Sequence, residues 1–308
     1  MGAVGIQRSA SMGILIFGGS GLVGTALTAA LRADGKDAVA VRAPRVGDLK
    51  WDPAADATEL AAMEGADAIV HLAGASIGDG RWTPERKQIL RSSRVDSTRL
   101  LVEAMARLQR KPRVFVCASA VGYYGSRGDE VLTESSSAGE DFLGKLTQDW
   151  EAQARRAEEI GIRTVLSRFG VILSAKGGAL PKMLTPFKLG VGGRLGDGRQ
   201  WMPWVALDDV VTAIQWAIAN PDARGAINMV SPNPAQNAEF TRVLAGALHR
   251  PAIFPAPAFA LRLMLGEMAD GLLLSSQRAK PERLVIAGFR FRFENLEGAL
   301  RHALGGSA

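Results

Sequence analysis

The stretch Met12-Gly-Ile-Leu-Ile-Phe-Gly-Gly-Ser-Gly-Leu-Val-Gly24 decides the fold that this sequence predicts. A short apolar run leads directly into glycines at Gly18, Gly21 and Gly24, and a helix-like segment follows. Backbone without side chains can turn sharply there, approach a pyrophosphate closely and let a helix start pack against a strand. The first N–H groups and the positive dipole end of that helix favour an anion. The stretch therefore predicts a phosphate-binding strand–loop–helix unit; a glycine-rich turn without a ligand is the alternative.

Strand-like and helix-like segments alternate through the first half of the chain. The apolar patterns predict strands at 14–17, 38–41, 68–71, 114–117 and 164–167, and helices at 22–33, 84–108 and 142–160. This order predicts an α/β fold, a Rossmann-type doubly wound parallel sheet with helices on both faces. Ligands of such sheets bind beyond the carboxyl ends of the strands.

The texture of the sequence changes after about residue 176, where glycine-rich and proline-containing stretches begin. We expect a flexible tail over residues 1–11, a nucleotide-binding Rossmann domain over 12–176, and a smaller C-terminal α/β substrate-binding or capping region over 177–304. The last region is expected to interleave with the sheet, because residues 227–230 resemble one more strand.

Composition argues against several classes of function. The net charge is +6, but basic and acidic residues are interspersed, which disfavours nucleic-acid binding. No apolar stretch reaches the roughly 18 residues that span a membrane, and residues 1–11 do not resemble a signal peptide, so we expect a cytoplasmic protein. A single cysteine, Cys117, excludes an internal disulfide, and the scattered histidines predict no metal site.

The end of the second predicted strand indicates which dinucleotide binds. An acidic residue there suits the ribose hydroxyl of NAD, whereas an arginine suits the 2′-phosphate of NADP. This strand ends at Arg42, and no acidic residue occurs before Asp48. A guanidinium can grip a phosphate through two hydrogen bonds, so NADP is favoured; a solvated arginine is the alternative.

Candidate catalytic groups follow the strand at 114–117. Ser119 falls at its carboxyl end, where a hydroxyl could reach a substrate oxygen, although a turn-forming serine is the simpler interpretation. Tyr123 and Tyr124, the two tyrosines of the whole chain, come just after it.

These residues give the chain a clear resemblance to the extended short-chain dehydrogenases/reductases. More narrowly, it resembles an epimerase-like family whose C-terminal part is a domain of unknown function. The motifs that carry this resemblance run along residues 12–304: Phe142-Leu143, Trp150-Glu151, Gly177–Leu180, Leu195–Gln200, Trp204-Val205, Asp208-Asp209, Asn237–Thr241, Arg250-Pro251 and Gly288-Phe289.

The resemblance implies a set of cofactor-binding positions. Those of the glycine loop, Gly18, Ser20, Gly21, Leu22, Val23 and Gly24, would line the pyrophosphate. Arg42 would meet the adenosine phosphate, and Leu72, Ala73 and Gly74 would pass under the nucleotide. Arg94 would face the cofactor from its helix, and Val171 would approach the nicotinamide.

The sequence departs from this superfamily at the catalytic helix. The superfamily carries Tyr-x-x-x-Lys there, with the lysine lowering the tyrosine pKa for proton transfer. Lys145 has Asp141 four residues before it instead of a tyrosine, and aligning the helix through Glu151 displaces Lys145 altogether. Lys145 therefore remains a catalytic candidate beside Ser119, Tyr123 and Tyr124, with a solvated helix residue as the alternative.

Two functions remain open from the sequence. One is an NADP(H)-dependent oxidoreductase or epimerase that acts on an unidentified small-molecule substrate through an atypical site, with Tyr123 or Tyr124 as the acid. The other is a non-catalytic NADP(H)-binding sensor or regulatory protein. The resemblance also implies a possible homodimer through the helices at 84–108 and 142–160.

Overall fold

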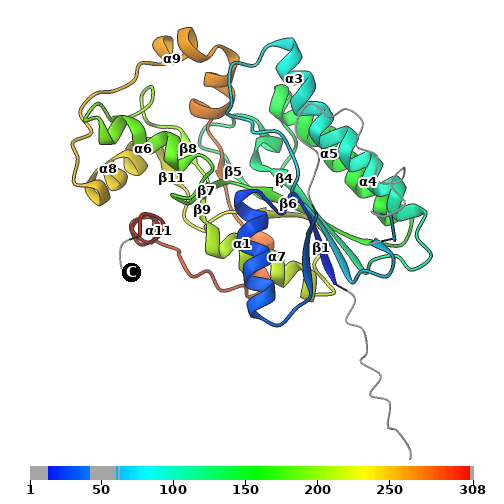
Figure 1. Cartoon of the computed structure of the whole chain (residues 1–308). Helices are drawn as coiled ribbons and strands as arrows, with labels where there is room; N and C mark the ends of the chain where they lie inside the picture. Colours follow the sequence, from blue (N-terminus) through cyan, green and yellow to red (C-terminus); the bar gives the residue numbers. More distant parts are fainter. Residues whose placement is uncertain (1–12, 42–59, 62, 306–308) are drawn as a thin grey trace, which may run out of the picture.

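A twisted sheet of six parallel strands forms the centre of the protein (Figure 1). The computed structural model describes residues 13–41, 60–61 and 63–305. In spatial order the strands are β10 (Gly225–Met229), β6 (Arg163–Phe169), β4 (Val114–Ala120), β3 (Ala68–His71), β1 (Ile14–Phe17) and β2 (Ala38–Val41). The predicted Rossmann-type parallel sheet is confirmed.

Helices cover both faces of this sheet. On one face α1 (Leu22–Ala33) packs beside α7 (Leu207–Ala219). The other face carries α3 (Pro84–Arg91), the π-helical turn η1 (Ser92–Asp96), α4 (Ser97–Ala106) and α5 (Phe142–Glu159). Successive side chains of a strand point to opposite faces, so β1 is buried on both sides and contributes to both layers.

The chain reverses direction across the sheet next to β1. It moves from β1 to β2 on one side and then crosses back to β3 on the other side of β1. Such a switch point leaves a crevice beyond the carboxyl ends of the two strands, where open α/β sheets bind ligands. The glycine loop that follows β1 lies at this point.

Most of the residues after 170 form a cap with its own apolar core. Its elements are β7 (Val171–Leu173), α6 (Leu180–Lys188), β8 (Trp201–Met202), β9 (Trp204–Ala206), β11 (Ala235–Gln236), α8 (Asn237–Leu248), α9 (Ala258–Leu265), η3 (Ala269–Leu273) and α11 (Leu296–Ala303). In Figure 1 α6 and α8 lie close together, whereas α9 lies apart from them, near α3. Because α7 and β10 return to the central layers, the C-terminal part of the chain is shared between cap and sheet.

Two side chains cover the outer edge of β10. The backbone N–H of Asn228 donates to Glu134 Oε1 at 3.0 Å. The guanidinium of Arg283, in α10 (Glu282–Ile286), donates to the carbonyl oxygens of Arg224 at 2.6 Å and Ala226 at 2.9 Å. These contacts satisfy backbone groups that an edge strand otherwise leaves open.

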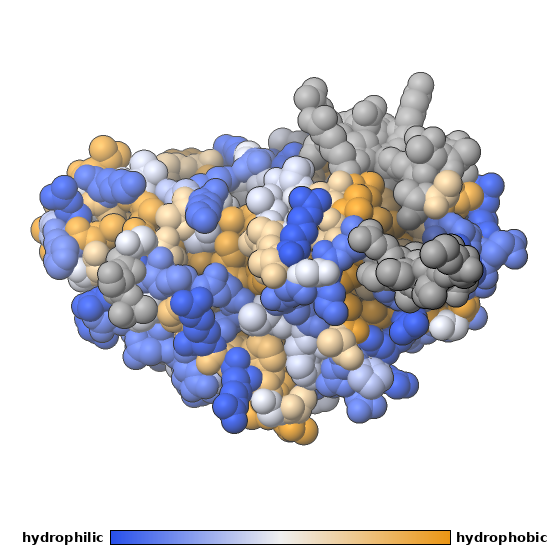
Figure 2. All heavy atoms as spheres, turned by 60° about the horizontal axis from the view of Figure 1, so that its bottom comes forward, coloured by the Kyte–Doolittle hydropathy of each residue, from blue (hydrophilic) through white to orange (hydrophobic). Residues whose placement is uncertain are grey.

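The surface carries mixed hydropathy. Figure 2 shows separate apolar patches surrounded by hydrophilic residues on the face that it presents. Among the residues that the structure describes, no helix combines the length and the apolar character needed to cross a membrane.

Candidate functional site

Three glycines after β1 have different structural roles. Gly18 has φ +83°, and a Cβ there would lie 2.7 Å from the backbone nitrogen of Ala73. A Cβ on Gly24 would lie 2.3 Å from the carbonyl oxygen of Gly18, so this glycine lets α1 start directly against the loop. A Cβ on Gly21 would meet only the oxygen of Gly18, at 3.3 Å, and otherwise points into open space. The loop is therefore a bare backbone cradle that is open at Gly21.

The backbone N–H groups at the start of α1 are not capped by a side chain. Gly21 is the N-cap, and no side chain accepts a hydrogen bond from the first turn, which contains Leu22 and Val23. Ser20 and Gly21 are exposed beside it. Free N–H groups at the positive end of a 12-residue helix suit a phosphate, so these residues fit the pyrophosphate of a dinucleotide.

The segment after β3 runs directly beside this loop. The backbone N–H of Leu72 donates to the oxygen of Phe17 at 2.8 Å, and Ala73 touches Gly18. Gly74 is exposed, and a Cβ there would lie 3.4 Å from Cζ of Arg94. The structure thus brings the predicted residues of β1, α1 and β3 together at the switch point.

Arg94 lies in the π-helical turn η1, which interrupts the single helix predicted over 84–108. Its guanidinium donates to the backbone oxygens of Ala75 at 2.9 Å and Leu90 at 3.2 Å, and stacks 5.4 Å from the ring centre of Trp150. Burial lowers the pKa of Arg94 to about 10. Within the described residues Arg94 has no carboxylate partner, so its charge can face an anion next to Gly74.

A row of polar residues crosses three strands near their carboxyl ends. In the parallel register Ser119 of β4 stands beside Arg168 of β6, and Arg168 stands beside Asn228 of β10. All three are 2% exposed or less. Ser119 was predicted from the sequence, whereas Arg168 and Asn228 were not. The signal that could have pointed to Arg168 was a charged residue near the carboxyl end of a predicted strand.

Glu151, on the inward face of α5, contacts two residues of this row. The hydroxyl of Ser119 donates to Glu151 Oε1 at 2.6 Å, and Arg168 donates to the two carboxylate oxygens at 2.7 and 2.8 Å. Glu151 is 4% exposed, so the paired charges are almost completely buried. A two-pronged pair of this kind fixes both side chains in one geometry.

The two tyrosines occupy different environments in the 3-10 turn η2 (Val121–Tyr124). The Tyr124 hydroxyl donates to Asn228 Oδ1 at 2.7 Å and accepts from Arg168 at 3.0 Å. Burial raises the pKa of Tyr124 to about 12. Tyr123 is half-buried, and the Arg168 guanidinium lies 3.5 Å from its ring centre. Within the described residues the Tyr123 hydroxyl has no hydrogen-bond partner, so it is the accessible phenol of the pair.

Lys145 does not join the cluster. Its side chain is 64% exposed, and Nζ lies 3.8 Å from Glu140. The face of α5 that points inward carries Leu143, Thr147 and Glu151, each 8% exposed or less. The structure therefore supports the solvated interpretation of Lys145, because the residue lies outside the inward face of the helix that carries Glu151.

The remaining predicted positions have mixed outcomes. Val171 starts β7, where its N–H donates to the oxygen of Pro203 at 2.7 Å, and it is half-buried. Arg42 lies outside the described residues. Cys117 is fully buried, as an inert thiol should be. No group of three metal-ligating side chains gathers within the described part of the chain.

Comparison with known proteins identifies the family. The model of the NAD dependent epimerase/dehydratase family matches residues 14–230, and that of a domain of unknown function (DUF1731) matches residues 256–303. The chain belongs to the NAD-dependent epimerase/dehydratase family. This confirms the predicted resemblance to extended short-chain dehydrogenases/reductases with a C-terminal domain of unknown function.

Relatives in this epimerase family span nearly the whole chain. An epimerase family protein of Mycobacterium bovis is 43% identical over 293 residues, covering 94% of this chain and 97% of its own. One of Bacillus subtilis is 38% identical over 299 residues, with shares of 94% and 97%.

Two solved structures of similar proteins support the same family assignment. The human epimerase family protein SDR39U1, crystallised with NADPH, is 33% identical with a TM-score of 0.86 and shares of 96% and 99%. A nucleoside-diphosphate sugar epimerase of Corynebacterium glutamicum is 36% identical with a TM-score of 0.77; the match covers 96% of this chain and 59% of that one. The fold of this chain is thus that of a family of NAD(P)-binding oxidoreductases and epimerases.

Proposed function

We propose that this protein is an NADP(H)-dependent oxidoreductase or epimerase whose proton-transfer site has been rebuilt without Tyr-x-x-x-Lys. The observation that carries the proposal is the buried Ser119–Glu151–Arg168 network beneath Tyr123. It lies at the carboxyl ends of β4 and β6, the end of the sheet at which the glycine loop follows β1. A redox cofactor and a proton donor can therefore meet over the same edge.

The cofactor is proposed to be NADP(H). The cradle at Gly21 and the uncapped start of α1 fit a pyrophosphate. The human relative was crystallised with NADPH, which supports the phosphate-bearing form. Arg42 is the residue proposed to bind the 2′-phosphate, because in the sequence it directly follows β2, the strand whose end selects the ribose in this fold.

Tyr123 is proposed as the group that exchanges a proton with the substrate. When bound, the nicotinamide accepts or supplies the hydride at the carbinol or carbonyl carbon. The Tyr123 phenol gives its proton to the substrate oxygen in reduction and takes it back in oxidation. Its ring is fixed against the flat face of Arg168, and Glu151 holds that guanidinium in place.

Ser119 is proposed as a positioning residue for Glu151. Its hydroxyl proton is already donated inward, so only the lone pairs of Oγ remain for a further hydrogen bond. A substrate hydroxyl can donate to those lone pairs, whereas a carbonyl cannot. Ser119 can therefore orient the oxygen of an alcohol substrate, as the sequence predicted, but not the oxygen of a carbonyl substrate.

One observation favours the second candidate, a non-catalytic NADP(H)-binding sensor. Counting back from Glu151, the inward positions of α5 hold Leu143 and Thr147, neither of which can transfer a proton as tyrosine and lysine do. A protein that binds the cofactor through an intact glycine loop but turns over no substrate would need no proton-transferring residue at these two positions.

A binding measurement followed by a single-turnover measurement separates the two candidates. We expect NADPH to bind by calorimetry and then to be oxidised when a panel of aldehydes and ketones is added. The matched control is the Tyr123→Phe variant, which should bind NADPH equally well and oxidise it slowly. Binding without oxidation across the panel would favour the sensor, and absence of NADPH binding would refute both.

A further inference from the structure

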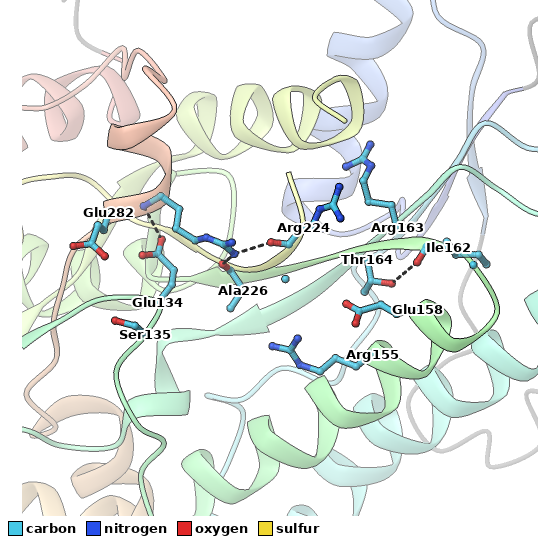
Figure 3. A pocket seen from close by; sticks show the side chains of 13 residues that line it. Glu134, Ser135, Arg155, Glu158, Ile162, Arg163, Thr164, Arg224, Ala226 and Glu282 are labelled. Carbon is cyan, nitrogen blue, oxygen red and sulfur yellow. Dashed lines mark hydrogen bonds between the residues drawn. The ribbon is translucent and has the colours of Figure 1, made fainter. Parts of the chain in front are cut away.

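A polar groove of about 830 Å³ lies where β6 and β10 begin, at the opposite end of these strands from Ser119. Its walls come from the end of α5, the start of β6, the turn before β10 and the first turn of α10. Figure 3 shows Arg155 projecting from α5 on one side of the hollow, with Arg163 and Arg224 on the other. Its volume is in the range of small-molecule sites.

Two of the four arginines in this groove serve the fold. Arg163 donates to the carbonyl oxygens of Ala217, Ile218 and Ala223 at 2.7–2.9 Å, at the end of α7. Arg283 covers the edge of β10. Their positions are therefore fixed by the backbone, independently of any ligand.

The other two arginines of the groove, Arg155 and Arg224, do not bind backbone carbonyl groups of the described residues in this way. Arg155 and Arg224 are exposed, and within the described residues neither guanidinium forms a hydrogen bond or an ion pair. The charge of Arg224 also helps to lower the pKa of Arg163, although burial contributes more. Glu158 and Glu282 also line the hollow, and Figure 3 shows Glu158 between Arg155 and Arg163, but within the described residues neither glutamate forms an ion pair with these arginines. With Glu134, three carboxylates face four arginines, so the lining keeps a net positive charge that favours an anion.

A carboxylate at the far wall has one oxygen without a partner. Glu134 Oε1 accepts from the backbone of Asn228, but Oε2 is buried and has no hydrogen-bond partner among the described residues. Burial raises the pKa of Glu134 above its ordinary value. A buried oxygen of this kind needs a donor, which a hydroxyl or amino group can provide.

We propose that this groove binds a phosphorylated small molecule. Arg155 and Arg224 receive the phosphate groups, because a guanidinium presents two parallel donors to phosphate oxygens. Glu134 accepts a hydrogen bond from a hydroxyl or amino group at the other end of the same molecule. The site is separate from the cofactor cradle, and its existence does not depend on the proposed catalytic function.

Inorganic pyrophosphate is the probe that tests the phosphate end. We expect it to bind the full chain by calorimetry in the presence of saturating NADPH. Arg155→Gln and Arg224→Gln should each weaken binding about tenfold or more, since each removes a charge-assisted contact. Arg242→Gln, an exposed arginine on α8, is the matched control and should leave the affinity unchanged.

Three results would overturn the proposal. The first is no binding of pyrophosphate up to millimolar concentration, and the second is equal affinity of all three variants and the wild type. The third is loss of the pyrophosphate signal when NADPH is added, which would place the ion at the glycine loop. If NADPH fails to bind, the pyrophosphate affinities of Arg224→Gln and Arg242→Gln are compared in its absence. Failure of the proposed NADP(H)-dependent function can therefore be distinguished from failure of the proposed groove.

Discussion

The hydroxyl of Ser119 donates a 2.6 Å hydrogen bond to Glu151 Oε1, and the same carboxylate holds Arg168 through two more bonds. The three residues come from a strand, a helix and a second strand, so the network joins three elements beneath Tyr123. Its charges are buried, and removing one partner leaves the other without compensation.

We expect Glu151→Gln to lower the free energy of unfolding by about 3–5 kcal/mol, because Arg168 would remain buried and charged without its partner. The measurement is urea unfolding followed by circular dichroism. The double variant Glu151→Leu/Arg168→Met removes both charges and should recover part of this loss. A single variant as stable as the wild type would contradict the burial of an intact ion pair.

The proposed acid predicts how strongly each of three substitutions slows NADPH oxidation. Tyr123→Phe should slow single-turnover NADPH oxidation by about 10²–10⁴-fold, the usual cost of losing a positioned acid. Ser119→Ala should also slow it, with an altered pH profile if its effect passes through Glu151. Lys145→Met should have little effect, since Lys145 is solvent-exposed. If Lys145→Met were as damaging as Ser119→Ala while both Tyr→Phe variants stayed active, the rebuilt site would be wrong.

Tyr124 gives a pH prediction with a defined sign. Its pKa is raised in the folded protein to about 12, from about 10 in an unfolded chain. The neutral phenol is thus favoured by folding, and this contribution is complete below pH 10 and lost as the pH rises through about 12. In the Tyr123→Phe variant Tyr124 is the one tyrosine left, so its phenolate absorbance can be titrated alone. A midpoint near pH 10 in folded protein would contradict this environment.

Cofactor selectivity should depend on Arg42. We expect NADPH to bind at least tenfold more tightly than NADH, because a charge-assisted contact to the 2′-phosphate contributes about 1.5–3 kcal/mol. Arg42→Ala should remove most of that preference in calorimetry while NADH binding stays the same. Equal NADPH affinities for variant and wild type would exclude Arg42 from the site.

The open side of the glycine loop should be sensitive to any side chain. Gly21→Val should abolish NADPH binding while the protein stays folded, because a Cβ there meets a single protein atom and points into the cradle. Gly246→Val on α8 is the control, since a Cβ there meets nothing within 4 Å. Retained binding in a folded Gly21→Val protein would falsify the assignment of this loop to the cofactor.

The elements around the switch point could be predicted almost residue by residue. The strands at 14–17, 38–41 and 68–71 and the helix at 22–33 end where expected, because glycines and short apolar runs limit them locally. β4 and β6 extend beyond the predicted ends to Ala120 and Phe169, because partner strands rather than local sequence decide where pairing stops.

The rest of the site depends on contacts between distant segments. The pairing of β4, β6 and β10 brings Arg168 and Asn228 beside Ser119, and the packing of α5 against β4 and β6 adds Glu151. No local sequence pattern contains either contact. The π-helical turn around Arg94 was likewise missed, since one widened helical turn leaves the apolar pattern over 84–108 nearly unchanged. Lys145 was a candidate because of spacing alone, and spacing does not say which face of a helix turns inward.

The covered edge of β10 limits how copies of this protein can associate. Glu134 and Arg283 already occupy backbone positions that an added strand would need. Joining two sheets through β10 into one continuous sheet, the route by which many edge strands polymerise, would first require both side chains to be displaced. Self-association by that route is therefore disfavoured.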